Sequence, residues 1–325
     1  MRHILTLDEI TPTELAYLCA LTQQLKQART TLNHPTPLVG RTVALLFEKP
    51  SLRTRVSFEV AARELGATSL YLSPQEVGLG KREAVKDVAQ VLSAYAHVIV
   101  LRTFSHALIE EFARHSQAPV INGLTDTHHP CQGLTDLFTI AEALGTPAGR
   151  TLAYVGDGNN VAHSLLQAAA KAGMHVRLAT PHGYAPDPKI VAQAQCEASA
   201  TGGSVSVLTN PQAAAHGADV IYTDVWASMG QESEAEKRRT VFAPYQVNGK
   251  LVALAAPHVI VMHPLPAHRG DEITDEVMDG PHARVFVQAE NRLHMQKAIL
   301  RFLLASESTA SATHMPARQL VLLGA

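Results

Sequence analysis

Two hydrophobic periods alternate along the first 134 residues. Apolar residues recur every three or four positions in some segments, which predicts amphipathic helices over 11–28, 56–67, 84–96 and 106–116. Between them lie short apolar runs of strand length at 42–47, 68–73, 97–102 and 118–124. Steady alternation of strand and helix is typical of a parallel sheet covered by helices.

A second alternation follows a helical segment at 135–145. Strands are expected over 149–157, 174–181, 204–209 and 258–263, and helices over 160–173, 188–203 and 289–300. The long polar stretch 224–251 is expected to be a loop followed by a helix. The pattern predicts an α/β fold with two domains, each a parallel β-sheet flanked by helices on both faces.

The expected domain boundaries are 1–134 and 135–291, with a hinge near Thr135. A C-terminal helix at about 292–307 is expected to pack back onto the first domain, and 308–325 to form a tail. A length of 325 residues fits two cores better than one.

Composition narrows the class of protein. A net charge of −2 without a basic tract gives no indication of nucleic-acid binding, and no apolar run is long enough to span a bilayer. The N-terminus lacks the pattern of a signal peptide. Three widely spaced cysteines favour reduced thiols and a cytoplasmic location.

The segment FEKPSLRTRVSFEV, residues 47–60, carries the first candidate chemistry. It places Ser51 and Thr54 where a helix begins, and a helix N-terminus with hydroxyl and guanidinium donors binds phosphate well. Arg53 and Arg55 cannot face the same way in a helix, so Arg53 is assigned to the anion. The alternative is a capped helix with two solvated arginines. No Walker-type loop is present, so the expected ligand is a small phosphate compound.

Four further stretches place polar residues after strands, where ligands bind in open α/β sheets. They are VLRTFSH with Arg102, THHPCQG with His129, GDGNN, and VMHPLP. GDGNNV resembles a dinucleotide-binding turn, which leaves an oxidoreductase as one alternative. However, Val161 stands where that turn needs its third glycine, and no acidic residue closes the next strand.

Six motifs together resemble the ornithine carbamoyltransferase family over about 300 residues. They are SLRTR, HPCQ, GDGNN, DVWASMGQE, HPLPAHRG and AENRLHMQKAIL, in the family's order. The resemblance implies transfer of a carbamoyl group from carbamoyl phosphate to the side-chain amine of L-ornithine, giving citrulline and phosphate.

Residue roles follow from the resemblance. The carbamoyl phosphate ligands would be Ser51, Leu52, Arg53, Thr54, Arg102, His129, Pro130, Cys131 and Gln132. The catalytic set would be Arg102, His129, Gln132 and Arg292. The ornithine ligands would be Asn160, Asp224, Ser228, Met229, Pro264 and Leu265. The resemblance also implies a homotrimer or a multiple of trimers, a place in arginine metabolism, and neither a cofactor nor a metal.

Two positions depart from the family pattern. Pro264 stands where the family usually has cysteine, and Gly78 where many relatives have glutamine or histidine; Lys81 or Arg82 could substitute for the latter. Pro264 keeps open a carbamoyltransferase for another amine, such as putrescine, lysine or an N-acylated ornithine. A non-catalytic relative that binds carbamoyl phosphate is a further alternative.

Overall fold

The computed structural model describes residues 2–31, 35–228 and 232–305. It divides into two compact units. Unit 1 comprises the residues up to Leu134 together with those from Asn291 on, and unit 2 is Thr135–Glu290. Two helices, α6 (Pro130–Leu144) and α13 (Val285–Ala305), contribute to both units. Thr135, where a hinge was expected, therefore lies inside a helix.

Unit 1 is built on a four-stranded parallel sheet in the order β2-β1-β3-β4. Its strands are β1 (Thr42–Phe47), β2 (Thr68–Leu72), β3 (Val98–Arg102) and β4 (Val120–Leu124). Both faces of β1 and β3 are buried, as expected for a parallel sheet between helices.

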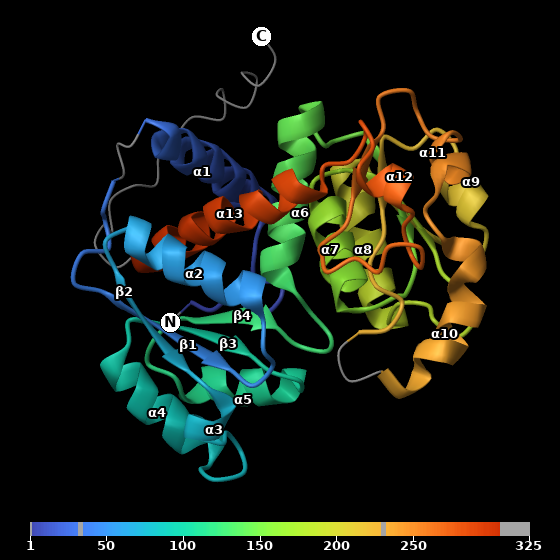
Figure 1. Ribbon diagram of the computed structural model, residues 1–325. Helices are drawn as coiled ribbons and strands as arrows, with labels where there is room; N and C mark the ends of the chain where they lie inside the picture. Colours follow the sequence, from blue (N-terminus) through green and yellow to red (C-terminus); the bar gives the residue numbers. More distant parts are fainter. Residues whose placement is uncertain (1, 32–34, 229–231, 306–325) are drawn as a thin grey trace. The chain divides into compact units, whose positions relative to one another are not determined.

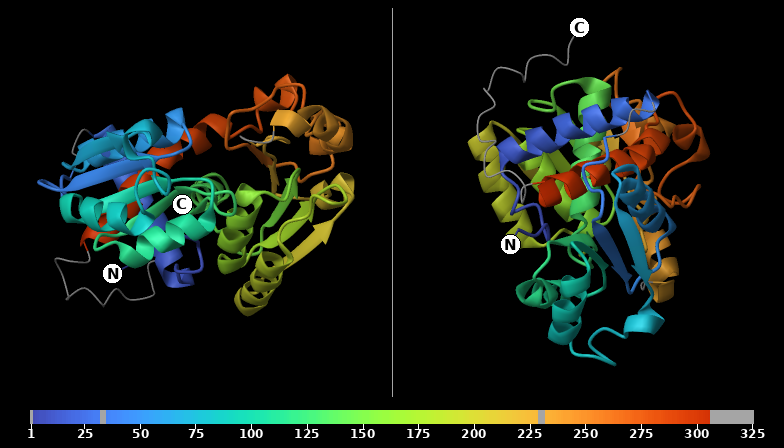
Figure 2. Two further views of the ribbon diagram at one scale, coloured as in Figure 1. Left: turned by 90° about the horizontal axis from the view of Figure 1, so that it is seen from below. Right: turned by 90° about the vertical axis from the view of Figure 1, so that its left-hand side faces the viewer.

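Helices cover both faces of this sheet (Figures 1 and 2). On one face, α4 (Val85–Tyr95) and α5 (His106–His115) bury an apolar cluster that includes Leu46, Leu101 and Phe112. On the other face lie α1 (Pro12–Thr30), α2 (Leu52–Glu64) and the second part of α13. The buried Lys297 joins these three helices, because its Nζ donates to Glu64 Oε2 at 2.8 Å and to the Leu25 carbonyl at 3.3 Å.

Unit 2 is built on a five-stranded parallel sheet in the order β7-β6-β5-β8-β9. Its strands are β5 (Thr151–Val155), β6 (His175–Ala179), β7 (Ser204–Leu208), β8 (Val220–Tyr222) and β9 (Ile260–Met262). Helices α7 (Asn160–Lys171) and α8 (Pro188–Thr201) lie on one face, and α9 (Pro211–Ala215), α10 (Ala235–Phe242), α11 (Gly249–Val252) and α12 (Asp275–Met278) lie on the other (Figure 1). The predicted α/β class, with two parallel sheets each flanked by helices, is confirmed.

Three local expectations were wrong. Helix α6 begins at Pro130 and not at residue 135, because proline needs no amide partner in the first helical turn. Helix α13 begins at Val285, before residue 289, where the apolar pattern placed its start, and before about 292, where the C-terminal helix was expected to begin. The four-residue helix α3 (Pro74–Val77) was not expected; it ends where Gly78 adopts a left-handed conformation. None of the helices in the described ranges has the length and apolar character needed to cross a membrane.

Candidate active site

The carboxyl ends of the parallel strands in unit 1 gather the candidate phosphate site. Strand β1 leads to Ser51 and helix α2, β3 ends at Arg102, and β4 leads to His129 and helix α6. Because all four strands are parallel, these three connections emerge at the same edge of the sheet.

The N-terminus of α2 is capped as the sequence predicts. The Ser51 Oγ accepts a hydrogen bond from the Thr54 N–H at 3.3 Å, and Leu52 is the first helical residue. The helix begins four residues earlier than the apolar pattern at 56–67 indicated. The first-turn amides at residues 52 and 53 have no acceptor within the helix, which is the arrangement that favours an anion.

Arg292 connects this helix terminus to α6. Its Nη2 donates to the Thr54 Oγ1 at 2.9 Å, and its Nη1 donates to the Gln132 Oε1 at 2.7 Å. All three side chains are buried. Arg292 therefore joins the first turn of α2 to the first turn of α6.

Arg53 and Arg55 point in different directions. Arg55 is exposed, donates to Glu59 Oε1 at 2.9 Å and lies 3.7 Å above the Tyr71 ring. Arg53 is near enough to Arg102 and His129 for its charge to lower the pKa of both. Arg55 is therefore engaged on the surface, and the assignment of Arg53 to the anion stays a prediction.

Positive charge is concentrated at this site, because the guanidinium groups of Arg53, Arg102 and Arg292 all act on His129. Burial, then the charges of Arg292 and Arg53, lower the pKa of Arg102. Burial, followed by Arg292, Arg102 and Arg53, lowers the pKa of His129 well below 6.5, so the imidazole stays neutral. The Nε of Arg102 is buried and makes no hydrogen bond within the described residues. An anion would relieve this repulsion.

Cys131 is a packing residue in the first turn of α6. Its Sγ lies 3.5 Å from the Asn122 carbonyl oxygen, and burial raises the pKa of the thiol to about 12. A thiol of this kind is not a nucleophile at neutral pH. Pro130 is buried beside it as the first residue of the helix.

Unit 2 gathers acidic groups instead. Asp224, just after β8, is buried; its Oδ2 accepts from Asn159 Nδ2 at 2.8 Å and its Oδ1 from the Val225 N–H at 2.8 Å. Burial raises the pKa of Asp224, against the opposing effects of His263 and Asn159. A cationic ligand would stabilise the ionised carboxylate. Ser228 and Asn160 are half-buried.

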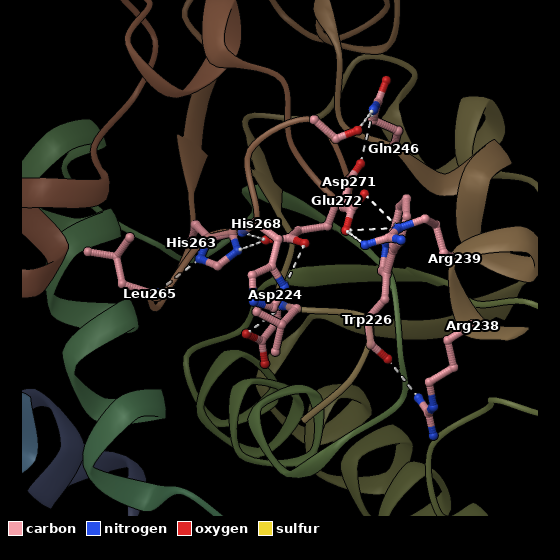
Figure 3. Close-up of polar contacts among 12 residues, drawn as sticks. Asp224, Trp226, Arg238, Arg239, Gln246, His263, Leu265, His268, Asp271 and Glu272 are labelled. Carbon is pink, nitrogen blue, oxygen red and sulfur yellow. Dashed lines mark hydrogen bonds and ion pairs between the residues drawn. The ribbon is translucent and has the colours of Figure 1, made fainter. Parts of the chain in front are cut away.

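The segment after β9 is held by a buried histidine. His263 Nδ1 accepts from the Leu265 N–H at 2.9 Å, so the ring proton is on Nε2, 3.1 Å from Glu272 Oε1 (Figure 3). Both His263 and Glu272 are fully buried. This contact holds Leu265 at φ 59°, a left-handed conformation that is unusual for a β-branched or bulky side chain. Pro264 is buried and offers no thiol.

Gly78 is required by the backbone at its position. It has φ +59°, and an added Cβ would lie 2.8 Å from the Arg82 Cβ. Arg82 Nη1 donates to the Glu76 carbonyl at 3.2 Å, so part of this guanidinium binds the backbone of its own segment. Lys81 is exposed.

Two protein-family models together match most of this chain. Residues 2–142 match the model described as "Aspartate/ornithine carbamoyltransferase, carbamoyl-P binding domain", and 148–303 match the corresponding "Asp/Orn binding domain". The chain belongs to the aspartate/ornithine carbamoyltransferase family. It is a carbamoyltransferase.

Similar proteins support the membership in this carbamoyltransferase family. An ornithine carbamoyltransferase of Halalkalibacterium halodurans is 51% identical over 307 residues, covering 94% of this chain and 96% of the relative. One of Symbiobacterium thermophilum is 55% identical over 269 residues, covering 83% and 87%. The solved ornithine carbamoyltransferase of Pyrococcus furiosus is 49% identical with a TM-score of 0.92, covering 94% of this chain and 97% of its own.

The sequence analysis did not predict two side-chain contacts of this carbamoyltransferase. Asn159, which the sequence analysis did not assign to the site, contacts Asp224; its position as the residue before a helix was the available signal. The pairing of His263 with Glu272 had no signal beyond their shared segment. Met229 lies outside the described residues.

Proposed function

We propose that this carbamoyltransferase acts on L-ornithine. It transfers the carbamoyl group of carbamoyl phosphate to the side-chain amine and releases L-citrulline and phosphate. The observation that carries the proposal is the group of buried donors in unit 1, formed by Thr54, Arg102, His129 and Arg292, with Arg53 beside them. These donors suit a phosphate dianion and a carbonyl oxygen that becomes negative.

Unit 1 binds carbamoyl phosphate. The first turn of α2, through Ser51, the Leu52 and Arg53 amides, Thr54 and the Arg53 side chain, holds the phosphate group. Arg102, His129 and Thr54 donate to the carbamoyl oxygen, with Arg292 beside them. Gln132 accepts from the carbamoyl nitrogen through its side-chain carbonyl oxygen, and Pro130 and Cys131 support this first turn of α6.

Unit 2 binds ornithine. Asp224, Asn160, Ser228 and Met229 hold the α-amino and α-carboxylate groups, and the backbone at Pro264 and Leu265 lines the site. The buried Asp224 supports this role because it complements a cationic amine.

The reaction needs the neutral side-chain amine. Its nitrogen attacks the carbamoyl carbon, and the carbonyl oxygen takes up negative charge that the donors of unit 1 stabilise. The bond from carbon to the phosphate oxygen then breaks, and the leaving phosphate accepts the proton that the nitrogen loses. Holding both substrates in place makes this bimolecular step effectively unimolecular.

A citrulline colour assay with carbamoyl phosphate and several amines tests the proposal. Ornithine should be the preferred acceptor over putrescine, lysine and N-acetylornithine. Activity with one of the other amines alone would contradict the substrate assignment and would point to Pro264 as its cause. Relatives about half identical to this chain bear the name ornithine carbamoyltransferase, which favours ornithine.

Three further properties belong to the same proposal. The enzyme is a homotrimer or a multiple of trimers, acts in the cytoplasm, and serves arginine metabolism. The three cysteines are free thiols, which agrees with a reducing compartment.

A further inference from the structure

Arg238, in α10, is buried among three separate segments of unit 2. Its Nη1 donates to Asp157 Oδ2 at 2.9 Å and to the Trp226 carbonyl oxygen at 2.8 Å, and its Nε donates to Glu234 Oε2 at 3.1 Å. Figure 3 shows the contact with Trp226. One guanidinium therefore joins the turn after β5, the segment after β8 and the beginning of α10.

Two of these segments carry the side chains assigned to ornithine. Asp157 stands three residues before Asn160, and Trp226 stands midway between Asp224 and Ser228. A second contact ties the same two segments, because Asn159 Nδ2 donates to Asp224 Oδ2 at 2.8 Å. Arg238 is thus one of the contacts that fix the relative position of the ornithine ligands.

The position requires an arginine. The planar guanidinium lies over the Tyr184 ring, with Cζ 4.9 Å from the ring centroid, while it binds two acceptors through Nη1 and a third through Nε. A lysine ammonium lacks this planar fork. Asp157 is also buried, and burial raises its pKa to about 6 even though Arg238 opposes the shift. Without the arginine this carboxylate would be buried and unpaired.

We propose that Arg238 is a positioning residue for ornithine: it fixes the turn that carries Asn160 against the segment that carries Asp224 and Ser228. This inference rests on the proposed function. It predicts a defect in ornithine binding, because the three acceptors of Arg238 belong to unit 2, whereas the residues assigned to carbamoyl phosphate belong to unit 1.

The experiment compares Arg238→Met and Arg238→Lys with Arg239→Met. Arg239 is the matched control, since its side chain is 57% exposed and pairs with Asp271 at 3.0 Å on the surface. Arg238→Met should raise the KM for ornithine at least about tenfold, because small displacements of binding groups have large kinetic effects. The KM for carbamoyl phosphate should stay within about twofold, because the segments that Arg238 joins carry no residue assigned to that substrate. Arg238→Lys should restore part of the loss, and Arg239→Met should behave like the parent enzyme.

Circular dichroism and thermal melting establish whether each variant is folded. If Arg238→Met does not fold, the Asp157→Asn variant tests the proposal instead. Its amide keeps the shape of the side chain and loses the charge. A rise of about threefold or more in the KM for ornithine alone would support the proposal, at the size expected for a weakened charged hydrogen bond.

An ornithine KM within about twofold of the parent in folded Arg238→Met, or in Asp157→Asn where that variant decides, would overturn the proposal, as would equal increases in both KM values. A parent enzyme that forms no citrulline from ornithine would instead contradict the proposed function. The two failures are therefore distinguishable.

Discussion

The candidate sites of the two units have opposite charge. In unit 1, guanidinium groups crowd around a neutral histidine, and the pKa values of Arg102 and His129 are lowered. In unit 2, the buried carboxylate of Asp224 follows β8, and burial raises its pKa. Each arrangement disfavours the charged form of its own side chains until a ligand of opposite charge binds. The contrast indicates that each unit is built for one substrate, an anion in unit 1 and a cation in unit 2.

The largest expected effect comes from removing a donor to the carbamoyl oxygen. Arg102→Met should lower kcat by about 10²–10³-fold, the usual loss for an oxyanion donor. Steady-state kinetics with both substrates saturating measure it, with Arg55→Met as the control. A kcat within tenfold of the parent would exclude Arg102 from the reacting site.

Removing the charge of Asp224 tests whether unit 2 binds the cationic substrate. Asp224→Asn should raise the KM for ornithine about 10–100-fold, because hydrogen bonds to charged groups contribute roughly 1.5–3 kcal/mol. The KM for carbamoyl phosphate should change little. If instead the KM for carbamoyl phosphate rose as much, the separation of charge between the units would not correspond to separate substrates.

Substitutions of Arg53 and Arg55, the two arginines at the start of α2, test whether unit 1 binds the anionic substrate. Arg53→Ala should raise the KM for carbamoyl phosphate at least about tenfold, whereas Arg55→Ala should leave it within about twofold, because Arg55 pairs with Glu59 and Tyr71 on the surface. Equal effects of the two substitutions would contradict the assignment of Arg53 to the phosphate.

The pH dependence of kcat/KM should distinguish deprotonation of the ornithine amine from protonation of His129. His129 has a lowered pKa, so its neutral form is present above pH 6.5 and is lost only on acidification below its ordinary range. It should give no inflection between pH 6.5 and 9. The ornithine amine, with an ordinary pKa of about 10.4, should make kcat/KM rise by up to about tenfold per pH unit between 7 and 9. A flat profile over that range would rule out amine deprotonation as a requirement.

Local patterns predicted most of the framework of this structure. The apolar run at Thr42–Phe47 coincides with β1, and the placement of Ser51 where a helix begins agrees with its position as the N-cap of α2. The start of α6 was missed because the pattern of apolar residues begins after its first turn, whereas Pro130 defines the helix start.

Local patterns could not predict contacts between residues that are far apart in the sequence. Arg292 is 160 residues from Gln132 and 238 from Thr54, and only the family resemblance assigned it to the site. Arg238 had no sequence signal, because burial and pairing with Asp157 are set by the packing of α10 and not by local periodicity. Long-range pairing of polar groups depends on the completed fold, which a single sequence does not display.

Calorimetric titration of carbamoyl phosphate into the parent enzyme, Arg53→Ala and Asp224→Asn tests the central claim most directly. The account predicts that Arg53→Ala weakens binding at least about tenfold and that Asp224→Asn leaves the dissociation constant within about twofold of the parent. Equal weakening by both substitutions, or unchanged binding by Arg53→Ala, would contradict the claim that unit 1 alone holds the anionic substrate.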